Sequence, residues 1–254
     1  VVFRKQNLTP SEFVAVARAL GEIEDYSSTA KEALMPGHPE ILMLTNIGNE
    51  SKPSVSKGAG QYWHTDRSYV SKPGWASFLY AREVPRDSNG VSLGETLFSN
   101  MIAAANALDF EDRQHLESLD AIHEYVYRFT DPEAGRRLSG VRQPVIIEHP
   151  ISGKKALYVN AGFTHSIVGM SEELSRSILQ RLFLHAENKD FVYTHYWEPD
   201  DLVIWDNFST QHCAVDNYSD AQRRMMWRTT LQGWPVNQRT NSSESIQSQA
   251  TAGA

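Results

Sequence analysis

Hydrophobic side chains recur at helical spacing near the start of the chain, where Phe13, Val16 and Ala17 share one face of a predicted helix. Thr9 and Glu12 stand at the two positions of a capping box, in which each residue satisfies a free amide near the helix start. The pattern therefore predicts a short helix that begins just after Thr9 and buries one face.

A second helix is predicted after Ser171, whose hydroxyl can accept a hydrogen bond from the first turn. Four apolar residues at helical spacing form its expected buried stripe: Leu174, Ile178, Leu182 and Phe183. Two further helices are expected over residues 101–108 and 111–119.

Most other apolar runs are short and bounded by turn-forming residues, which is typical of β-strands. They cover residues 1–3, 41–44, 62–69, 76–81, 95–98, 145–148, 156–160, 191–197, 201–205 and 223–232. Many short strands with a few inserted helices favour a mainly β protein of the α+β type, a β-sandwich or jelly roll with helices outside it. We expect one domain over residues 1–236 and a polar, disordered tail over residues 237–254.

Charge and cysteine content narrow the possible functions and partners. The 254-residue chain carries 24 Lys and Arg against 31 Asp and Glu, a net charge of −7, so no nucleic-acid partner is expected. The single cysteine, Cys213, excludes an internal disulfide framework and a cysteine-rich zinc site. We expect a reducing, cytoplasmic location. No apolar run approaches the roughly 18 residues of a membrane span, so no membrane association is expected.

Candidate metal ligands occur in the segment Tyr-Trp-His-Thr-Asp at residues 62–66. On a strand, side chains two positions apart point to the same face, so His64 and Asp66 would direct a nitrogen and a carboxylate to one point. His212 can supply a third ligand from a neighbouring strand. Two histidines and one carboxylate form the facial triad of non-haem Fe(II) oxygenases.

Two arginines that follow His212, Arg224 and Arg228, have the same strand parity as Met226. If Met226 points inward, both arginines do as well. Inward arginines need anionic partners, because an unpaired buried charge is costly. A dicarboxylate is one such partner, since arginine holds a carboxylate through two parallel hydrogen bonds.

The ordered motifs WHTD, GETLF, VNAGFTHSIVG, VIWDN, QH and QRRMMWR resemble the TauD/TfdA family of Fe(II)- and 2-oxoglutarate-dependent dioxygenases. The resemblance runs from residue 1 to about Trp234. It implies a double-stranded β-helix, a jelly roll of the cupin type, in which His64, Asp66 and His212 hold the iron. Family members carry a further N-terminal segment, which we expect to be missing from this sequence.

The resemblance also implies the co-substrate contacts. Thr96 matches a threonine that hydrogen-bonds 2-oxoglutarate, and Arg224 matches the arginine that binds its distal carboxylate. Arg223 competes with Arg224 for this role if the preceding loop is shorter than assumed. Arg228 matches a second family arginine near the other end of the co-substrate, which in taurine-type members also meets the anionic group of the substrate.

The implied reaction oxidises a substrate C–H bond with O₂ and converts 2-oxoglutarate to succinate and CO₂. Because related halogenases lack the carboxylate ligand, Asp66 favours hydroxylation or another oxidative outcome over halogenation. We expect a small anionic substrate, such as a carboxylate, sulfonate or phosphonate. Dimers or tetramers are common among relatives, so a homo-oligomer is expected.

The expected substrate contacts are the residues around the first ligand and in a later tyrosine-rich segment: Gln61, Tyr62, Tyr125, Tyr127, Arg128 and Arg228. Taurine-type relatives carry an asparagine four positions before the first histidine ligand. This chain has Gly60 there, so taurine-like contacts are not expected.

Three alternatives stay open at this point. The first is a natural-product tailoring oxygenase of the same family, with desaturation or another oxidative outcome. The second is a cupin-like metallohydrolase that uses zinc or manganese, which would leave Arg224 and Thr96 without a role. The third is a metal-binding module without turnover, against which the intact set of ligands argues.

Overall fold

The computed structural model describes residues 1–27, 30–48, 60–125 and 140–236. Within them the elements follow in the order β1 (Val2–Phe3), α1 (Pro10–Arg18), a 3₁₀ turn η1 (Lys31–Ala33), β2 (Leu34–Met35), β3 (His38–Thr45), β4 (Ala76–Glu83), β5 (Thr96–Asn100), α2 (Met101–Asn106), α3 (Phe110–Leu116), β6 (Asp120–His123), β7 (Val141–Pro144), β8 (Ile146–Glu148), β9 (Lys155–Leu157), β10 (Thr164–Ile167), α4 (Glu172–Ala186), β11 (Val192–His195), β12 (Leu202–Asp206), β13 (Thr210–Ala214) and β14 (Met225–Thr230).

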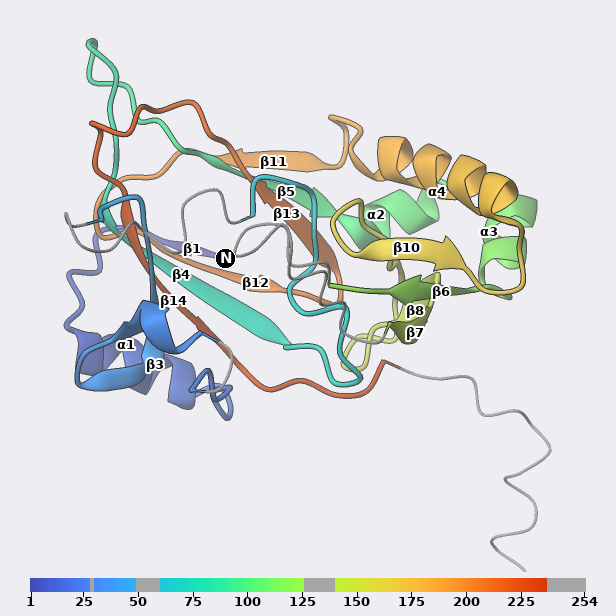
Figure 1. The fold of residues 1–254 in the computed structure, drawn as a ribbon, viewed down its shortest axis with the longest axis horizontal. Helices are drawn as coiled ribbons and strands as arrows, with labels where there is room; N and C mark the ends of the chain where they lie inside the picture. The colour runs from blue at the N-terminus through green and yellow to red at the C-terminus, as the bar shows by residue number, and fades with distance from the viewer. Residues whose placement is uncertain (28–29, 49–59, 126–139, 237–254) are drawn as a thin grey trace, which may run out of the picture.

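The largest sheet has six antiparallel strands in the order β1-β12-β4-β14-β3-β2 (Figure 1). Its central strand β4 is buried along its first six residues, as expected for a strand covered on both faces. Strand β14 lies between β4 and β3, and the pairing of Arg228 with Leu79 on β4 and Leu42 on β3 fixes its register. This register places Arg228 in the middle of the sheet.

A second sheet of three antiparallel strands, β11-β5-β13, supplies the facing layer. Core residues from the two sheets pack together, including Phe98 of β5, Leu79 of β4 and Met226 of β14. In the second sheet, Thr96 pairs with His195 on one side, and His212 pairs with Phe98. Two sheets packed over one core confirm the expected mainly β jelly roll.

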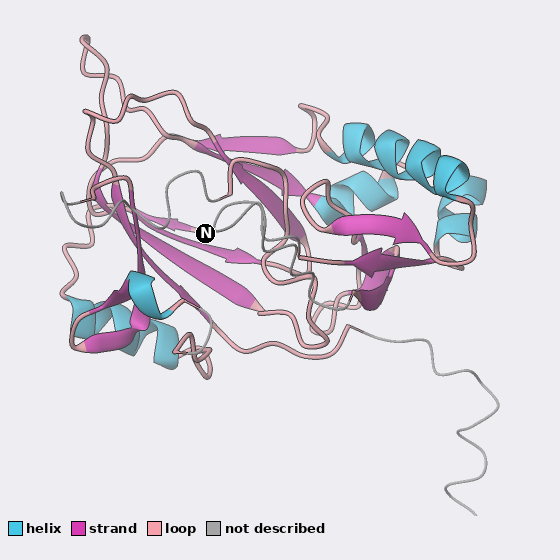
Figure 2. Ribbon diagram, in the orientation of Figure 1, coloured by secondary structure: helices cyan, strands magenta, loops and turns pink. Residues whose placement is uncertain are grey.

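The helices gather at the two ends of the molecule, as Figures 1 and 2 show. Helix α1 packs on β3 and β14, and its first turn has the predicted capping box of Thr9 and Glu12. Helices α2, α3 and α4 lie at the opposite end together with the sheet β10-β6-β7 and the hairpin β8-β9. No helix among the described ranges is long and apolar enough to cross a membrane.

Two expectations about local structure are wrong. Residues 62–69 do not form a strand: His64 makes one isolated bridge, and the chain then turns at Arg67, which has a positive φ of 56°. In α4, Leu174 is 51% exposed, and the buried face consists of Ser175, Leu179, Leu182 and Ala186. Ser171 caps this helix as predicted, but the buried face is rotated by one residue. The expected tail, residues 237–254, lies outside the described residues.

Candidate metal centre and co-substrate cavity

The two candidate histidine ligands are held side by side by the main chain. The amide of His64 donates to the carbonyl oxygen of His212 at 2.9 Å, and the amide of His212 donates back to His64 at 2.8 Å. This antiparallel bridge brings the two ring centroids to 4.2 Å. Since His212 lies in β13, the second sheet fixes where both rings stand.

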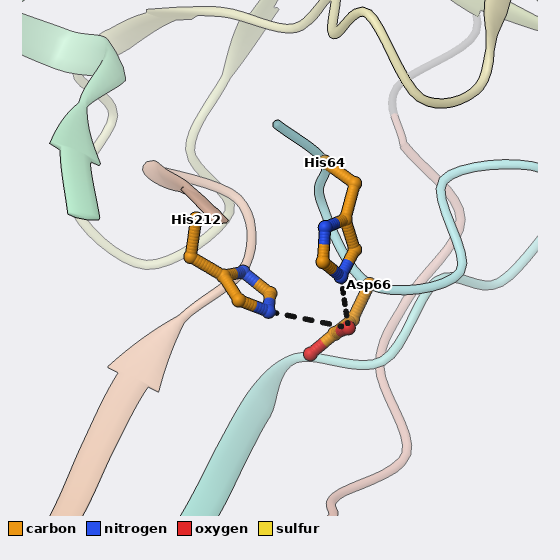
Figure 3. Close-up of side chains that lie close together, drawn as sticks. All are labelled: His64, Asp66 and His212. Atoms are coloured by element: carbon orange, nitrogen blue, oxygen red, sulfur yellow. Dashed lines mark ion pairs between the residues drawn. The ribbon is translucent and has the colours of Figure 1, made fainter. Parts of the chain in front are cut away.

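Asp66 completes the group from the turn that follows His64 (Figure 3). Its Oδ1 lies 3.5 Å from His64 Nε2 and 3.7 Å from His212 Nε2. The ligand atoms of the three residues all lie within 4.8 Å of one another, and all three side chains are buried. Two imidazole nitrogens and one carboxylate oxygen therefore converge, which is the donor set that suits non-haem Fe(II).

Hydrogen bonding and burial prepare both imidazoles for a metal. His64 Nδ1 donates to the carbonyl oxygen of Tyr62 at 2.8 Å, which leaves the lone pair on Nε2 directed at Asp66. Burial, together with the neighbouring His64, holds the pKa of His212 well below its usual range. His64 Nε2 and the neutral ring of His212 are therefore both available to a metal.

The carboxylate of Asp66 is kept ionised inside the protein. Burial alone would raise its pKa, but Arg228 and the two histidines hold the pKa of Asp66 well below its usual range. Arg228 Nη2 lies 2.7 Å from Oδ1, and the hydroxyl of Ser77 donates to Oδ2 at 2.6 Å. Both carboxylate oxygens thus have partners that orient the group.

A buried chain of hydrogen bonds supports Ser77 in turn. Asn207 Nδ2 donates to the Ser77 hydroxyl at 3.0 Å, and Trp205 Nε1 donates to Asn207 Oδ1 at 3.0 Å. We did not predict Ser77 or Asn207 as functional residues. The motif VIWDN, which contains Asn207, was the one sequence signal that pointed to this region.

The predicted co-substrate residues share one cavity with the histidine ligands. A cavity of about 100 Å³ is lined by His64, His212, Thr96, Arg224 and Arg228. Gln61, predicted as a substrate contact, also lines it. The cavity reaches from the two candidate histidine ligands to the buried guanidinium of Arg224, as a chelating dicarboxylate would require.

Arg224, and not Arg223, is the arginine inside the protein. Arg224 is 9% exposed, forms no ion pair with a carboxylate among the described residues, and its Nε has no hydrogen-bond partner there. Arg223 is exposed and pairs with Glu83 at 2.6 and 3.0 Å. Burial lowers the pKa of Arg224 from its usual value, but a guanidinium stays charged at neutral pH. The buried cation is therefore suited to an anionic ligand.

The position of the Arg224 side chain depends on Gly94. This glycine has a φ of +72°, and an added Cβ would lie 3.0 Å from Arg224 Nε. Its carbonyl oxygen accepts from Arg224 Nη2 at 3.4 Å, and its amide donates to Asn217 Oδ1 at 2.8 Å. Neither the backbone conformation nor the space is suited to a larger residue.

An aromatic cluster covers the other side of His64. The Phe163 ring centroid lies 5.7 Å from that of His64, 5.8 Å from that of Tyr62 and 4.8 Å from that of Tyr69. Tyr125 joins the cluster at 4.9 Å from Tyr69. We call these four residues, Tyr62, Tyr69, Tyr125 and Phe163, the aromatic wall.

The aromatic wall contains two of the predicted substrate residues, Tyr62 and Tyr125, and two that we did not predict, Tyr69 and Phe163. Phe163 lies in the family-like motif VNAGFTHSIVG, which could have identified it. Tyr127 and Arg128, also predicted as substrate contacts, lie outside the described residues.

A second arginine near Asp66 is already paired. Arg67 Nη1 lies 2.6 Å from Glu24 Oε2, and Glu24 is 7% exposed. Burial raises the pKa of Glu24, which Arg67 opposes. Arg67 and Arg228 therefore both contact a carboxylate, in contrast to Arg224.

Comparisons with known proteins agree with this geometry. Residues 1–230 match the family model described as "Taurine catabolism dioxygenase TauD, TfdA family". Pentalenolactone F synthase of Streptomyces arenae is 32% identical over 238 residues, which cover 86% of this chain and 77% of that protein. Alpha-ketoglutarate-dependent 2,4-dichlorophenoxyacetate dioxygenase of Cupriavidus pinatubonensis is 30% identical over 246 residues, covering 91% of this chain and 84% of that protein.

A solved structure shows the same fold. The structure of AAD-2 in complex with Mn(II) and N-oxalylglycine superposes with a TM-score of 0.75 at 30% sequence identity. The superposition covers 93% of this chain and 85% of that one.

Proposed function

The chain belongs to the TauD, TfdA family of α-ketoglutarate-dependent dioxygenases, and on this premise we propose that it oxidises a C–H bond of a small organic substrate at the site formed by His64, Asp66 and His212. The family, the enzyme class and the use of Fe(II), 2-oxoglutarate and O₂ that the sequence led us to expect are confirmed. The reaction converts 2-oxoglutarate to succinate and CO₂ while the substrate is oxidised, in the first instance hydroxylated.

In this proposal His64, Asp66 and His212 hold the iron, which when bound supplies the activation of O₂. The convergence of their ligand atoms supports this role, as does the hydrogen bond from His64 Nδ1 to the Tyr62 carbonyl, which leaves Nε2 facing the proposed metal position. The protein contributes position and charge: Ser77 and Arg228 orient the carboxylate of Asp66, and the bridge between the histidines fixes the two rings.

The co-substrate is assigned to the cavity between the histidines and Arg224. The single observation that carries this assignment is the buried guanidinium of Arg224, which lines the same cavity as both histidines and meets no carboxylate in the described part of the chain. A distal carboxylate bound there would satisfy the cation through parallel hydrogen bonds. Thr96 lines the same cavity and offers a hydroxyl to the co-substrate.

For the substrate we propose a small organic anion that lies against the aromatic wall. Arg228 is the proposed contact for the anionic group of the substrate. Its guanidinium lies beside Asp66, and its side chain is partly accessible, at 20% exposed. Phe163 and Tyr62, both in ring contact with His64, supply apolar area beside the metal ligands. Gly60 in place of an asparagine argues against taurine itself.

Tailoring of a natural product is the second candidate within the same chemistry. The similarity to pentalenolactone F synthase supports it, at 32% identity. A product with a new hydroxyl group would favour scavenging or detoxifying hydroxylation, and a product with a new double bond or ring would favour tailoring.

Two other possible functions have less support from the site. A metallohydrolase would have no use for the buried Arg224 beside the metal ligands, and a non-catalytic module would need no ordered support for Asp66. The presence of Asp66 also disfavours halogenation, because the carboxylate fills the position that chloride would take.

We further propose that the protein acts in the cytoplasm as a homo-oligomer, a dimer or a tetramer. The lone Cys213, with no partner cysteine in the sequence, suits a reducing compartment. Light scattering coupled to size exclusion tests the oligomeric state, and a monomeric mass would contradict it.

A substrate screen tests the proposal. Iron-loaded protein is incubated with 2-oxoglutarate, ¹⁸O₂ and a panel of aryloxy carboxylates, sulfonates and terpenoid acids, and succinate and oxidised products are measured by mass spectrometry. We expect succinate formation that a true substrate stimulates, with ¹⁸O in a hydroxylated product. Turnover of a substrate without 2-oxoglutarate or O₂ would contradict the proposal and favour a hydrolase.

A further inference from the structure

The hydroxyl of Thr96 has a buried partner on the side away from the cavity. Trp197 Nε1 lies 3.0 Å from Thr96 Oγ1, and both residues are buried. An indole nitrogen can only donate a hydrogen bond, so Thr96 Oγ1 accepts this bond. The direction of the contact is therefore fixed by chemistry.

This direction decides where the proton of the Thr96 hydroxyl can go. A threonine hydroxyl has one proton and two lone pairs, and Trp197 uses one of the lone pairs. Among the described residues, no acceptor lies within hydrogen-bond distance of that proton, and Thr96 lines the cavity with Arg224 and His212. The proton is thus free to be donated to an anionic ligand in the cavity.

Trp197 is itself held in one place. Its side chain is fully buried in the core between the two sheets, together with Phe98 and Met226. The ring of His195 packs against it edge to face, with centroids 4.4 Å apart and an interplanar angle of 84°. Since Thr96 and His195 are paired residues on β5 and β11, strand register also fixes the indole relative to the hydroxyl.

We propose that Trp197 is a positioning residue for the co-substrate: its indole N–H occupies the rear lone pair of Thr96 and so directs the Thr96 hydroxyl proton into the cavity, toward a carboxylate oxygen of 2-oxoglutarate. This inference rests on the proposed assignment of 2-oxoglutarate to the cavity. Trp197 acts through Thr96 and has no contact with the ligand cavity of its own. A fixed donor loses less rotational freedom on binding than a free hydroxyl, and an accepted hydrogen bond strengthens the one donated.

The test measures the dissociation constant of 2-oxoglutarate from anaerobic, Fe(II)-loaded protein by the visible charge-transfer absorption of the chelate. Trp197→Phe keeps an aromatic ring in the core but removes the donor. We expect the dissociation constant to rise about three- to tenfold, the effect of one neutral hydrogen bond. The affinity for Fe(II) is measured separately by competition with a chromophoric chelator. We expect it to stay within about twofold of wild type, because Trp197 makes no hydrogen bond to His64, Asp66 or His212.

A double-mutant cycle separates positioning from packing. Thr96→Val removes the hydroxyl at constant shape and should weaken 2-oxoglutarate binding about tenfold or more, whereas Thr96→Ser should retain most of the affinity. If Trp197 acts through the hydroxyl, Trp197→Phe adds no further loss to Thr96→Val but still weakens binding in the Thr96→Ser background. The matched control is Trp227→Phe. Trp227 is a buried tryptophan in the core on the α1 side of the large sheet, so this variant should leave 2-oxoglutarate affinity unchanged.

If Trp197→Phe does not fold, β-(3-benzothienyl)alanine at position 197 replaces it, because benzothiophene keeps the shape of indole and lacks the N–H. Unchanged 2-oxoglutarate affinity in either Trp197 variant, fully additive losses in the cycle, or an equal loss in Trp227→Phe would each overturn the inference. Absence of the charge-transfer band in folded, iron-loaded wild type would instead overturn the proposed function on which the inference rests.

Discussion

The main-chain amides of His64 and His212 each donate to the carbonyl oxygen of the other residue, at 2.9 and 2.8 Å. The two rings are therefore brought together by backbone pairing between distant segments, and this pairing does not depend on the side chains. We therefore predict that the ligand set forms before metal binds, in contrast to small zinc domains that fold on their metal.

The first prediction concerns the iron affinity of the proposed ligand His212. His212→Ala removes one of three ligands but keeps the backbone bridge, so we expect iron affinity to fall by more than the roughly 10–100-fold typical for loss of a supporting partner. Far-ultraviolet circular dichroism should stay unchanged. Cys213→Ala, at the next position in β13, is the matched control and should bind iron like wild type. A His212→Ala protein that is unfolded would show that the site organises the fold.

Ser77 is predicted to tune the metal site without binding the metal. Ser77→Ala removes the donor to Asp66 Oδ2 and the acceptor for Asn207 Nδ2, so iron affinity should fall roughly 10–100-fold and the free energy of unfolding by about 1–3 kcal/mol. Ser99 offers a matched control, since it is equally buried and its hydroxyl donates to the Ala186 carbonyl oxygen at 2.6 Å. Ser99→Ala should lose similar stability in denaturant unfolding and keep full iron affinity. Equal iron affinity in both variants would contradict the role of Ser77.

Gly94 is predicted to be required for co-substrate binding because a Cβ would meet Arg224 Nε at 3.0 Å. Gly94→Ala should raise the dissociation constant of 2-oxoglutarate about tenfold or more, since the carboxylate–guanidinium geometry is disturbed. Gly90 has a similar φ of +82° but nothing within 4 Å of an added Cβ, so Gly90→Ala carries the same backbone strain, about 1–2 kcal/mol, without the contact. Weakened 2-oxoglutarate binding in Gly90→Ala as well would show that strain alone explains the effect.

A fourth prediction concerns the pH dependence of stability. Burial lowers the pKa of His123 to about 3, below the ordinary histidine value of about 6.5. Between these values the unfolded chain binds a proton that the folded protein does not, so this residue makes stability fall as pH drops from about 6.5 toward 3. The slope from one such group reaches about 1.4 kcal/mol per pH unit.

Urea unfolding of wild type and of His123→Gln at several pH values isolates the contribution of His123 to the pH dependence of stability. The free energy of unfolding of the variant should depend less steeply on pH than that of wild type, by up to one proton in this window. The exposed His165→Gln is the control and should follow wild type. Parallel curves for His123→Gln and wild type would contradict the assignment of this slope to His123.

The sequence predicted that His64, Asp66 and His212 would lie together, and the structure brings them together, but part of the reasoning was wrong. The argument for His64 and Asp66 assumed a strand, whereas the chain bridges once at His64 and then turns, with a positive φ at Arg67. Local periodicity cannot report this turn, because Thr65 to Tyr69 carry no glycine or proline to mark it. The spacing nevertheless brings the two side chains together.

Other parts of the site depend on contacts between distant segments and could not be read from a local pattern. Ser77 lies on β4 and Asp66 lies in the turn after His64, so only the folded chain brings them into contact. In the same way, Phe163 contacts His64 from the loop before β10. Strand parity does explain why Arg224 faces inward and Arg223 outward. The wrong prediction of the buried face of α4 has a similar origin. Ser175 lies on that face because its Oγ accepts a hydrogen bond from the Ile167 amide at 2.7 Å, a contact that hydrophobicity does not encode.

One measurement tests the central claim, that an iron held by His64, Asp66 and His212 binds 2-oxoglutarate against Arg224. Protein free of metal is titrated anaerobically with Fe(II) and 2-oxoglutarate, and the weak visible charge-transfer band is recorded for wild type, His212→Ala, Arg224→Ala and Arg223→Ala. The band should form in wild type, vanish in His212→Ala, require much more 2-oxoglutarate in Arg224→Ala, and be unchanged in Arg223→Ala. No band in folded, iron-loaded wild type, or equal weakening by both arginine variants, would contradict the claim.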